Sequence, residues 1–499
     1  MTTGFRLRAR ASARLAGALA EAVGLRAGSV DMAAGFGLPA SGRARAIAAR
    51  SLAPRRLAIR LAAIVLGGLA VPGLSFAQTS EAMPKPRPTG RVSLFADAWT
   101  ADPDGAAPRS FRELVSTVTF HAAETDEDGL DYGLDLRYAG VNGGTRPART
   151  SIYEAFVGAR LGDGTLRVRG GHLWLNDLGG LGSLAGGQVE IRQQATERRA
   201  IGRWRAGAFG GLEPKVFEAG YYHDVKKVGV YGALDGADAR RHVLGYVNVR
   251  DGSLTERSVV TTTNYVPVRR AFFLYQAAEY DVARPAGQAQ PGLTYFYANA
   301  RANPTDRLEL QGTYHRGRSI DTRGLADDVI NARPISPTAV QGLAYQSVGG
   351  RVTVQPVRRV RVYGGYWQDK SNREDVPAGR MMLGGYAPNI AGSGFDLSAS
   401  ETRVHRSSTS YHSEYVSVGH SIGRQAYVSG DYTTSLSVIR FARGSDGLII
   451  EDRPTTRRLS GTASVNVGPT TSLQITVDQT WDTGVRELRI LSGVSYRLR

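Results

Sequence analysis

Apolar and polar residues alternate along most of the chain after about residue 91. In the stretch 308–315, Leu308, Leu310 and Tyr314 fall on one side of the alternation and polar residues on the other. The stretches 132–139, 296–303, 459–467 and 473–478 follow the same rule. Successive side chains of a strand point to opposite faces, so each stretch is apolar on one face and polar on the other. The pattern predicts an all-β structure from Arg91 to Arg499.

The predicted strands are about 10–13 residues long, whereas strands of soluble proteins are typically about 5–6 and tilted membrane strands need about 9–11. Their connections alternate between short and long. Short turns are predicted at 163–164, 303–306, 356–358, 422–424 and 468–470, and long connections at 319–342, 370–401 and 441–455. This order predicts one large antiparallel transmembrane β-barrel with short periplasmic turns and long extracellular loops. Counting strands back from the C-terminus, with 212–225 as one outer loop, gives about 20 strands, within a range of 18–22.

The segment 55–77 has the three parts of a secretory signal peptide. Arg55, Arg56 and Arg60 precede an apolar run over residues 61–74, and Ser75-Phe76-Ala77 provides a cleavage site before Gln78. Four regions follow from this interpretation: an N-terminal extension over 1–54, disordered or upstream of the true translation start, the signal peptide 55–77, a periplasmic linker 78–90, and the barrel 91–499. No later segment has 18 consecutive apolar residues, so no transmembrane helix is expected.

Charge and composition exclude several classes of protein. The formal charge is +17, but residues 1–77 hold 11 Arg against two acidic residues, a net of +9, which leaves +8 for the rest. Those remaining charges form no basic block, so nucleic-acid binding is not expected. The chain has no Cys, which excludes disulfides, Cys-ligated zinc and a thiol nucleophile. No metal or other cofactor is expected.

Four tryptophans lie near the ends of predicted strands: Trp99, Trp174, Trp367 and Trp481. Amphipathic rings favour the boundary between lipid and water, so these residues are predicted to form aromatic girdles. The alternative is ordinary packing of individual rings.

The polar faces of the strands would line the lumen of such a barrel. The pore-lining candidates are Arg137, Glu154, Arg160, Arg167, Arg169, Arg301, Glu309, Arg351, Arg361 and Arg489, with His315 and Asp478 beside them. Most of these are basic, which predicts a mild preference for anions. The alternative is that the arginines pair with carboxylates of neighbouring strands and only stiffen the wall.

The chain resembles Gram-negative outer-membrane β-barrels of the porin type in this pattern, and most specifically in two stretches. Residues 168–187 are similar to passages of substrate-type porins and polysaccharide-export barrels in which a strand runs into a Gly-rich loop that folds inward and narrows the pore. Residues 488–499 resemble a closing strand, although Leu498 and Arg499 stand where Phe or Trp is usual. The resemblance implies surrounding outer-membrane lipid and lipopolysaccharide, recognition of the C-terminal strand by the barrel-assembly machinery, and passage of small hydrophilic solutes or export of a polymer.

Three functional classes remain open. The first is a diffusion channel, the second a structural or adhesive barrel without a channel, and the third a barrel enzyme. The third rests on the spacing of His405 and Ser407, which is that of outer-membrane phospholipases, but the surrounding residues differ, so no enzymatic activity is expected. A soluble β-propeller is the rival fold, and it is disfavoured because no repeat of about 40–50 residues is present.

Overall fold

The computed structural model describes residues 88–122, 127–142, 147–194, 202–215, 218–236, 239–268, 271–283, 291–443 and 448–498. The predicted signal peptide, its cleavage site at Ala77 and Gln78, and the extension 1–54 lie outside the described residues. The first strand begins at Thr89, two residues before the expected start of the barrel.

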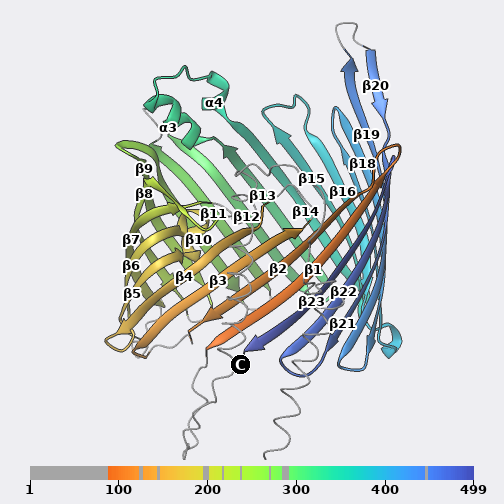
Figure 1. Ribbon diagram of the computed structural model, residues 1–499, viewed down its shortest axis with the longest axis horizontal. Coiled ribbons are helices and arrows are strands. Elements are labelled where there is room, and N and C mark those ends of the chain that lie inside the picture. The colour runs from red at the N-terminus through yellow and green to blue at the C-terminus, as the bar shows by residue number, and fades with distance from the viewer. Residues whose placement is uncertain are drawn as a thin grey trace, which may run out of the picture. The chain divides into compact units, whose positions relative to one another are not determined.

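Antiparallel strands form the whole wall (Figure 1). Consecutive strands pair along the chain except at β20, where β19 pairs with β21, and β1 also pairs with β23, which closes the sheet. The strands are β1 (Thr89–Pro103), β2 (Arg109–His121), β3 (Gly129–Asn142), β4 (Arg149–Leu161), β5 (Leu166–Trp174), β6 (Ser183–Arg192), β7 (Arg203–Pro214), β8 (Tyr221–Asp235), β9 (Arg241–Asp251), β10 (Leu254–Val268), β11 (Phe272–Ala283), β12 (Gly292–Thr305), β13 (Leu308–Ser319), β14 (Leu343–Val357), β15 (Val360–Ser371), β16 (Ala378–Ala387), β17 (Phe395–His405), β18 (Thr409–Ile422), β19 (Ala426–Arg443), β20 (Leu448–Asp452), β21 (Thr455–Asn466), β22 (Thr471–Asp482) and β23 (Val485–Leu498).

The closed wall contains 22 strands, and β20 is an extra one. The long strand β19 pairs with β21 along its lower part and with β20 near its end, so β20 extends the sheet beyond the wall. The all-β barrel predicted from the sequence is thereby confirmed, with a strand number at the upper end of the predicted range.

The prediction of 20 strands was too low because 370–401 is not one connection. It contains β16 and part of β17, and these two strands account for the difference. The stretch Met381-Met382-Leu383-Gly384-Gly385 lacks the alternation that marks the other strands, so the sequence pattern did not identify it. The predicted outer loop 212–225 is also shorter, since β7 ends at Pro214 and β8 begins at Tyr221.

Helices occur only in connections within the described ranges. The 3-10 helix η1 (Asn176–Gly182) joins β5 to β6, α3 (Thr322–Ile330) and α4 (Pro337–Gln341) lie between β13 and β14, and η3 (Ile390–Gly392) precedes β17. Asp321 caps α3 by accepting a hydrogen bond from Gly324 N, and Ser336 caps α4 in the same way through Thr338 N. In the described part of the chain, no helix is long and apolar enough to cross a membrane.

Strand β8 shows how the two faces of the wall differ. Val225, Lys227 and Tyr231 are buried on one face, while Val228 and Val230 on the other are 51% and 54% exposed. The buried face is the lumen side, because it contacts segments that enter the barrel. The opposite, outer face carries a row of exposed apolar side chains that continues around the wall. This two-faced wall is the arrangement that the alternation predicts.

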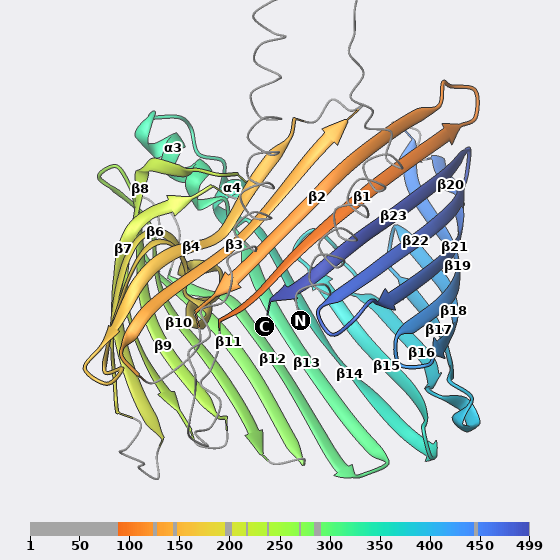
Figure 2. The same ribbon diagram turned by 60° about the horizontal axis from the view of Figure 1, so that its bottom comes forward.

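Strands β1 and β23 lie side by side at the seam (Figure 2), and side chains on their lumen face also join them. Arg489 donates to Asp97 with a distance of 2.7 Å between Nη2 and Oδ2, and the hydroxyls of Ser93 and Ser495 lie 2.8 Å apart. The first and last strands are therefore joined by side chains as well as by their backbones.

Gly493 on β23 is expected to be essential for this seam. A Cβ added there would lie 2.1 Å from Cδ1 of Phe95, so Gly493→Ala should lower the free energy of unfolding by about 1–3 kcal/mol through overpacking. Urea titration followed by heat-modifiable gel mobility measures this change. Gly461→Ala is the control, because nothing lies within 4 Å of a Cβ at that position. Equal stability of the two variants would contradict the expectation.

Candidate functional site

The Gly-rich connection between β5 and β6 turns into the lumen. Its helix η1 lies against β9 and β10, which are three or more strands away along the wall. Leu178 is 1% exposed and belongs to a buried cluster with Val247 and Val259 from those strands. Gly182 lets the end of η1 pass close to its start, since a Cβ there would lie 2.1 Å from the carbonyl oxygen of Leu175. The apolar cluster thus fixes an inward segment on one side of the lumen.

The helix α3 is a second inward segment, nearer the rim than η1, and it also lies against β10. Its own residues Leu325 and Ala326 are buried. Arg323 binds Glu213 on β7 and Glu256 on β10, with Nη2 to carboxylate oxygen distances of 3.1 and 3.3 Å. Its guanidinium also lies 4.2 Å from the centre of the Tyr222 ring. One arginine therefore ties the connection from β13 to two distant strands.

Loss of this tie is expected to free the connection. Arg323→Ala removes both ion pairs and the ring contact, so limited proteolysis within 320–342 should become several times faster in folded barrels. Arg333→Ala is the matched control in the same connection, because Arg333 and its partner Asp327 are both more than half exposed. An unchanged cleavage rate in Arg323→Ala would show that the apolar contacts of Leu325 and Ala326 hold α3 without it.

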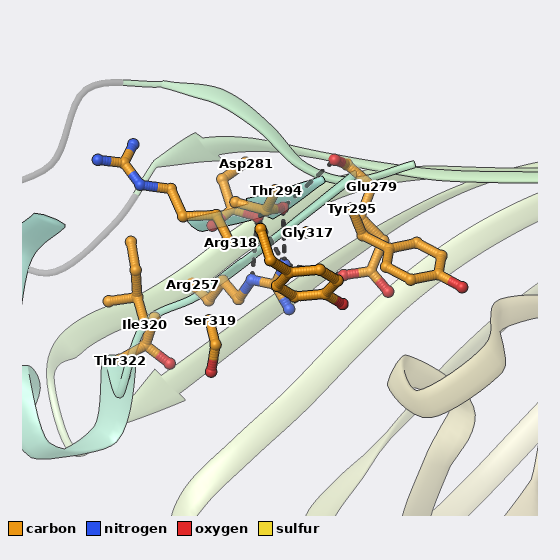
Figure 3. Close-up of a pocket in the computed structure, with 11 residues that line it drawn as sticks. Arg257, Glu279, Asp281, Thr294, Tyr295, Gly317, Arg318, Ser319, Ile320 and Thr322 are labelled. Carbon is orange, nitrogen blue, oxygen red and sulfur yellow. Dashed lines mark hydrogen bonds and ion pairs between the residues drawn. The ribbon is translucent and has the colours of Figure 1, made fainter. Parts of the chain in front are cut away.

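A cavity of about 260 Å³ lies beneath the start of this connection (Figure 3). Three of its charged groups are paired with one another: Arg257 donates to Asp281 at 2.8 Å and to Glu279 at 2.8 Å, and Thr294 donates to Asp281 at 2.9 Å. Two rings complete the lining, Tyr295 and Tyr345. The remaining lining residues are Gly317, Arg318, Ser319, Ile320 and Thr322.

Cations on β5 and β7 are paired with carboxylates, as in this cavity, and two of them share one carboxylate. Arg167 and Arg169 both bind Asp131. Arg205 binds Asp177 on η1 and Asp235 on β8. These groups are largely buried, and a buried charge is stable only when it is paired. The wall from β3 to β11 therefore contains charge pairs that hold strands and inward segments together.

The lumen face from β12 to β16 differs, because several of its guanidiniums lie against aromatic rings. Arg301 is 5.7 Å from the centre of the Phe273 ring, and Arg380 is 5.0 Å from that of Trp367. Arg361 precedes Trp367 by six residues on β15, so the two side chains point to the same face of the wall. Within the described ranges, no carboxylate lies within ion-pair distance of Arg301, Arg361 or Arg380.

A ring cluster lies next to these arginines. His315 on β13 contacts Tyr295, Tyr297 and Tyr345 edge to face, with ring centres 5.5, 5.8 and 4.8 Å away. The Tyr345 hydroxyl lies 3.0 Å from Nε2 of His315. The lumen wall from β12 to β16 is thus aromatic and basic.

The remaining pore-lining candidates are distributed between the two kinds of environment. Arg489 binds Asp97, and Arg351 binds Glu309 at 3.4 Å while its guanidinium lies 5.5 Å from the centre of the Tyr363 ring. Other predicted positions lie as follows: Glu154 is 3.6 Å from His121, Arg160 donates to the Leu130 carbonyl, Arg137 lies between Thr117 and Ser151, and Asp478 binds Arg458.

The predicted girdle tryptophans lie on both faces of the wall. Trp174 and Trp481 share the outer face with exposed apolar neighbours. Trp99 stands directly across from Arg489 on the lumen face, and Trp367 donates from Nε1 to Thr313 at 3.0 Å on that same face. Trp204, which was not among the predicted girdle residues, lies on the outer face and is 46% exposed.

The phospholipase-like pair does not share a strand. His405 ends β17 and Ser407 lies in the connection to β18. A serine nucleophile needs a histidine within hydrogen-bond reach, and in the described part of the chain no hydrogen bond joins these two residues.

No protein-family model and no curated protein matches the chain. Solved structures similar to it include Acinetobacter baumannii OccAB4, with 9% identity, a TM-score of 0.40, and coverage of 83% of this chain and 98% of that one. Pseudomonas aeruginosa OpdQ has 9% identity, a TM-score of 0.39, and coverage of 83% and 97%. Pseudomonas aeruginosa OccK8 (OprE) has 8% identity, a TM-score of 0.40, and coverage of 83% and 98%. The β-barrel architecture of the chain rests on its own closed wall of paired antiparallel strands.

Proposed function

We propose that the chain is an outer-membrane channel through which small hydrophilic solutes diffuse, with a preference for anions. The observation that carries this proposal is the lumen wall from β12 to β16, where Arg301, Arg361 and Arg380 have no carboxylate partner among the described residues. Fixed unpaired charges along a water-filled path raise the local concentration of the opposite ion. The paired charges of the other wall have a structural role.

The outer face supports the membrane location. Exposed apolar side chains on the wall match a hydrocarbon layer, and a closed barrel leaves no unpaired strand edge within it. Trp174, Trp204 and Trp481 are placed in the aromatic girdles. Lipid and lipopolysaccharide then surround the wall, and the assembly machinery engages β23. Export uses the signal peptide 55–77, so the mature protein from the outer-membrane fraction should begin at Gln78.

Conductance across planar bilayers tests the channel. The purified mature protein is expected to insert in discrete steps, and a salt gradient should give a reversal potential of the sign produced by anions. Insertion without conductance, verified by heat-modifiable mobility of the reconstituted sample, would refute the channel. Clear cation selectivity would refute the anion preference alone.

The hairpin of β19 and β20 favours a second function, adhesion to a partner outside the cell. Strand β20 pairs only with β19 and extends the sheet past the closed wall, and Ile449 on it is 67% exposed. An exposed strand end offers an edge for another chain. Cell adhesion that depends on residues 444–452 while conductance is absent would favour this function over the channel.

A further inference from the structure

A group of charged side chains interrupts the outer face of β17 and β18. Glu401 and Arg403 lie on β17, and His412 and Glu414 lie directly across from them on β18 in reverse order. They are joined to one another: Nε of Arg403 donates to Glu401 at 2.5 Å, and Nε2 of His412 lies 3.0 Å from the same carboxylate. Below, these four residues are called the outer charged group.

Strand pairing places this group outside rather than in the lumen. Met381 and Leu383 pair with Arg403 and Glu401, and both are exposed apolar residues of β16. Arg380, the residue next to Met381, lies against Trp367, whose indole donates to Thr313 on the lumen face. Since successive side chains point to opposite faces, Met381 and its partners point outward.

Glu401 and Glu414 lie within the apolar belt, and Arg403 and His412 lie two residues nearer to its upper edge. Strand β17 starts at the rim with the exposed Phe395, and Glu401 is six residues further, which is about 15 Å in height at about 3.3 Å per residue and a tilt of about 40°. The belt of such barrels is about 25 Å tall. Leu383 on one side and Leu436 on the other continue the apolar surface at the level of the group. Charged groups facing lipid at this depth are costly, so a partner is expected to cover them.

We propose that a second copy of this chain covers the outer charged group, in a two-fold dimer through β17 and β18. Two barrels in one membrane keep the same orientation, so their two-fold axis runs along the membrane normal and sets β17 of one copy against β18 of the other. This inference rests on the membrane location proposed above, and it does not depend on conductance.

Charge and height support an isologous contact. Arg403 and Glu414 are the most exposed members of the group, at 61% and 58%, and they carry opposite charges. They are diagonal neighbours on adjacent strands, and the tilt of the strands visible in Figure 1 brings them to nearly equal height. Across the axis, Arg403 of each copy therefore meets Glu414 of the other, which gives two reciprocal ion pairs away from water.

Charge reversal tests the contact in protein extracted from outer membranes with mild detergent. The wild type is expected to have twice the mass of one mature chain by native mass spectrometry. Arg403→Glu and Glu414→Arg should each weaken the dimer about tenfold or more, since like charges then face each other in a desolvated contact. The double variant Arg403→Glu with Glu414→Arg should restore it. Arg316→Glu, on the outer face of β13, is the matched control and should leave the dimer unchanged.

Cross-linking provides a second test that needs no charge reversal. Because the chain has no Cys, two differently tagged copies can carry Arg403→Cys and Glu414→Cys separately, and a mixed disulfide is expected in whole outer membranes. Leu310→Cys with Glu414→Cys should give none. A wild type that stays monomeric would overturn the proposal. The same holds if the monomer carries bound lipopolysaccharide and Arg403→Glu releases that lipid. Conductance of the same samples is scored separately, so a conducting monomer refutes the dimer alone, and a silent dimer refutes the channel alone.

Discussion

Replacing Arg301, Arg361 and Arg380 together by glutamine is expected to reverse the ion preference of the channel from anions to cations. These three guanidiniums of the wall from β12 to β16 have no carboxylate partner among the described residues, whereas Arg205 binds Asp177 and Arg167 and Arg169 share Asp131. With the three unpaired positive charges gone, the acidic side chains that remain near the path determine the local potential. The reversal potential in a KCl gradient should change sign.

Three outward arginines provide the control for net charge. Arg112, Arg316 and Arg457 lie on the outer face of β2, β13 and β21 by the alternation of their strands. Their joint replacement by glutamine removes the same charge from the protein but not from the lumen, so the reversal potential should stay as in the wild type. An equal shift in both triple variants would mean that overall charge, and not the aromatic and basic wall, sets the preference.

Removing η1 is expected to give the largest change in conductance. The ends of this segment are already close, since Leu175 N donates to the Gly182 carbonyl at 3.0 Å, so an Asn-Gly turn can replace residues 176–182 without moving β5 or β6. An inward segment reduces the cross-section open to ions, so its loss should raise the single-channel conductance roughly twofold. Steps in planar bilayers at fixed salt measure this directly.

The deletion also removes buried apolar contacts and Asp177, a partner of Arg205. The stability of the variant is therefore expected to fall, and folded barrels have to be selected by heat-modifiable mobility before conductance is measured. Deletion of residues 444–452 is the control, because β20 extends the sheet at the rim and does not enter the lumen. If shortening the η1 segment leaves the conductance unchanged, the narrowest part of the path lies elsewhere.

The two-faced strands could be predicted because alternation is a local property of the chain. Val225 to Ala233 on β8 alternates residue by residue between buried and exposed. The strands β16 and β17 escaped prediction because small and unbranched residues such as Met381, Gly384 and Ser398 blur the alternation, and only pairing with β15 and β18 identifies them. The strand number therefore required the complete set of pairings.

The alternation did not predict which charged residues are paired with carboxylates and which are not. Arg167 and Arg301 look alike in the sequence, each on the polar face of a strand. Arg167 meets Asp131 from two strands away, while Arg301 lies against Phe273. Similarly, Trp99 and Trp367 near strand ends are on the lumen face, and Trp174 and Trp481 are on the outer face. A shift of one residue in register moves a side chain to the other face, and strand ends are where register is hardest to predict.

By itself, the sequence determined that this protein is built of long two-faced antiparallel strands, because burial on one face of a strand leaves a period of two in the chain. The tertiary structure alone decided that 22 strands close the wall, that η1 and α3 occupy one side of the lumen, and which arginines stay without a carboxylate. Those features depend on residues far apart in the chain, such as Asp97 with Arg489 and Leu178 with Val247. Their contacts form only when register and closure bring distant strands together.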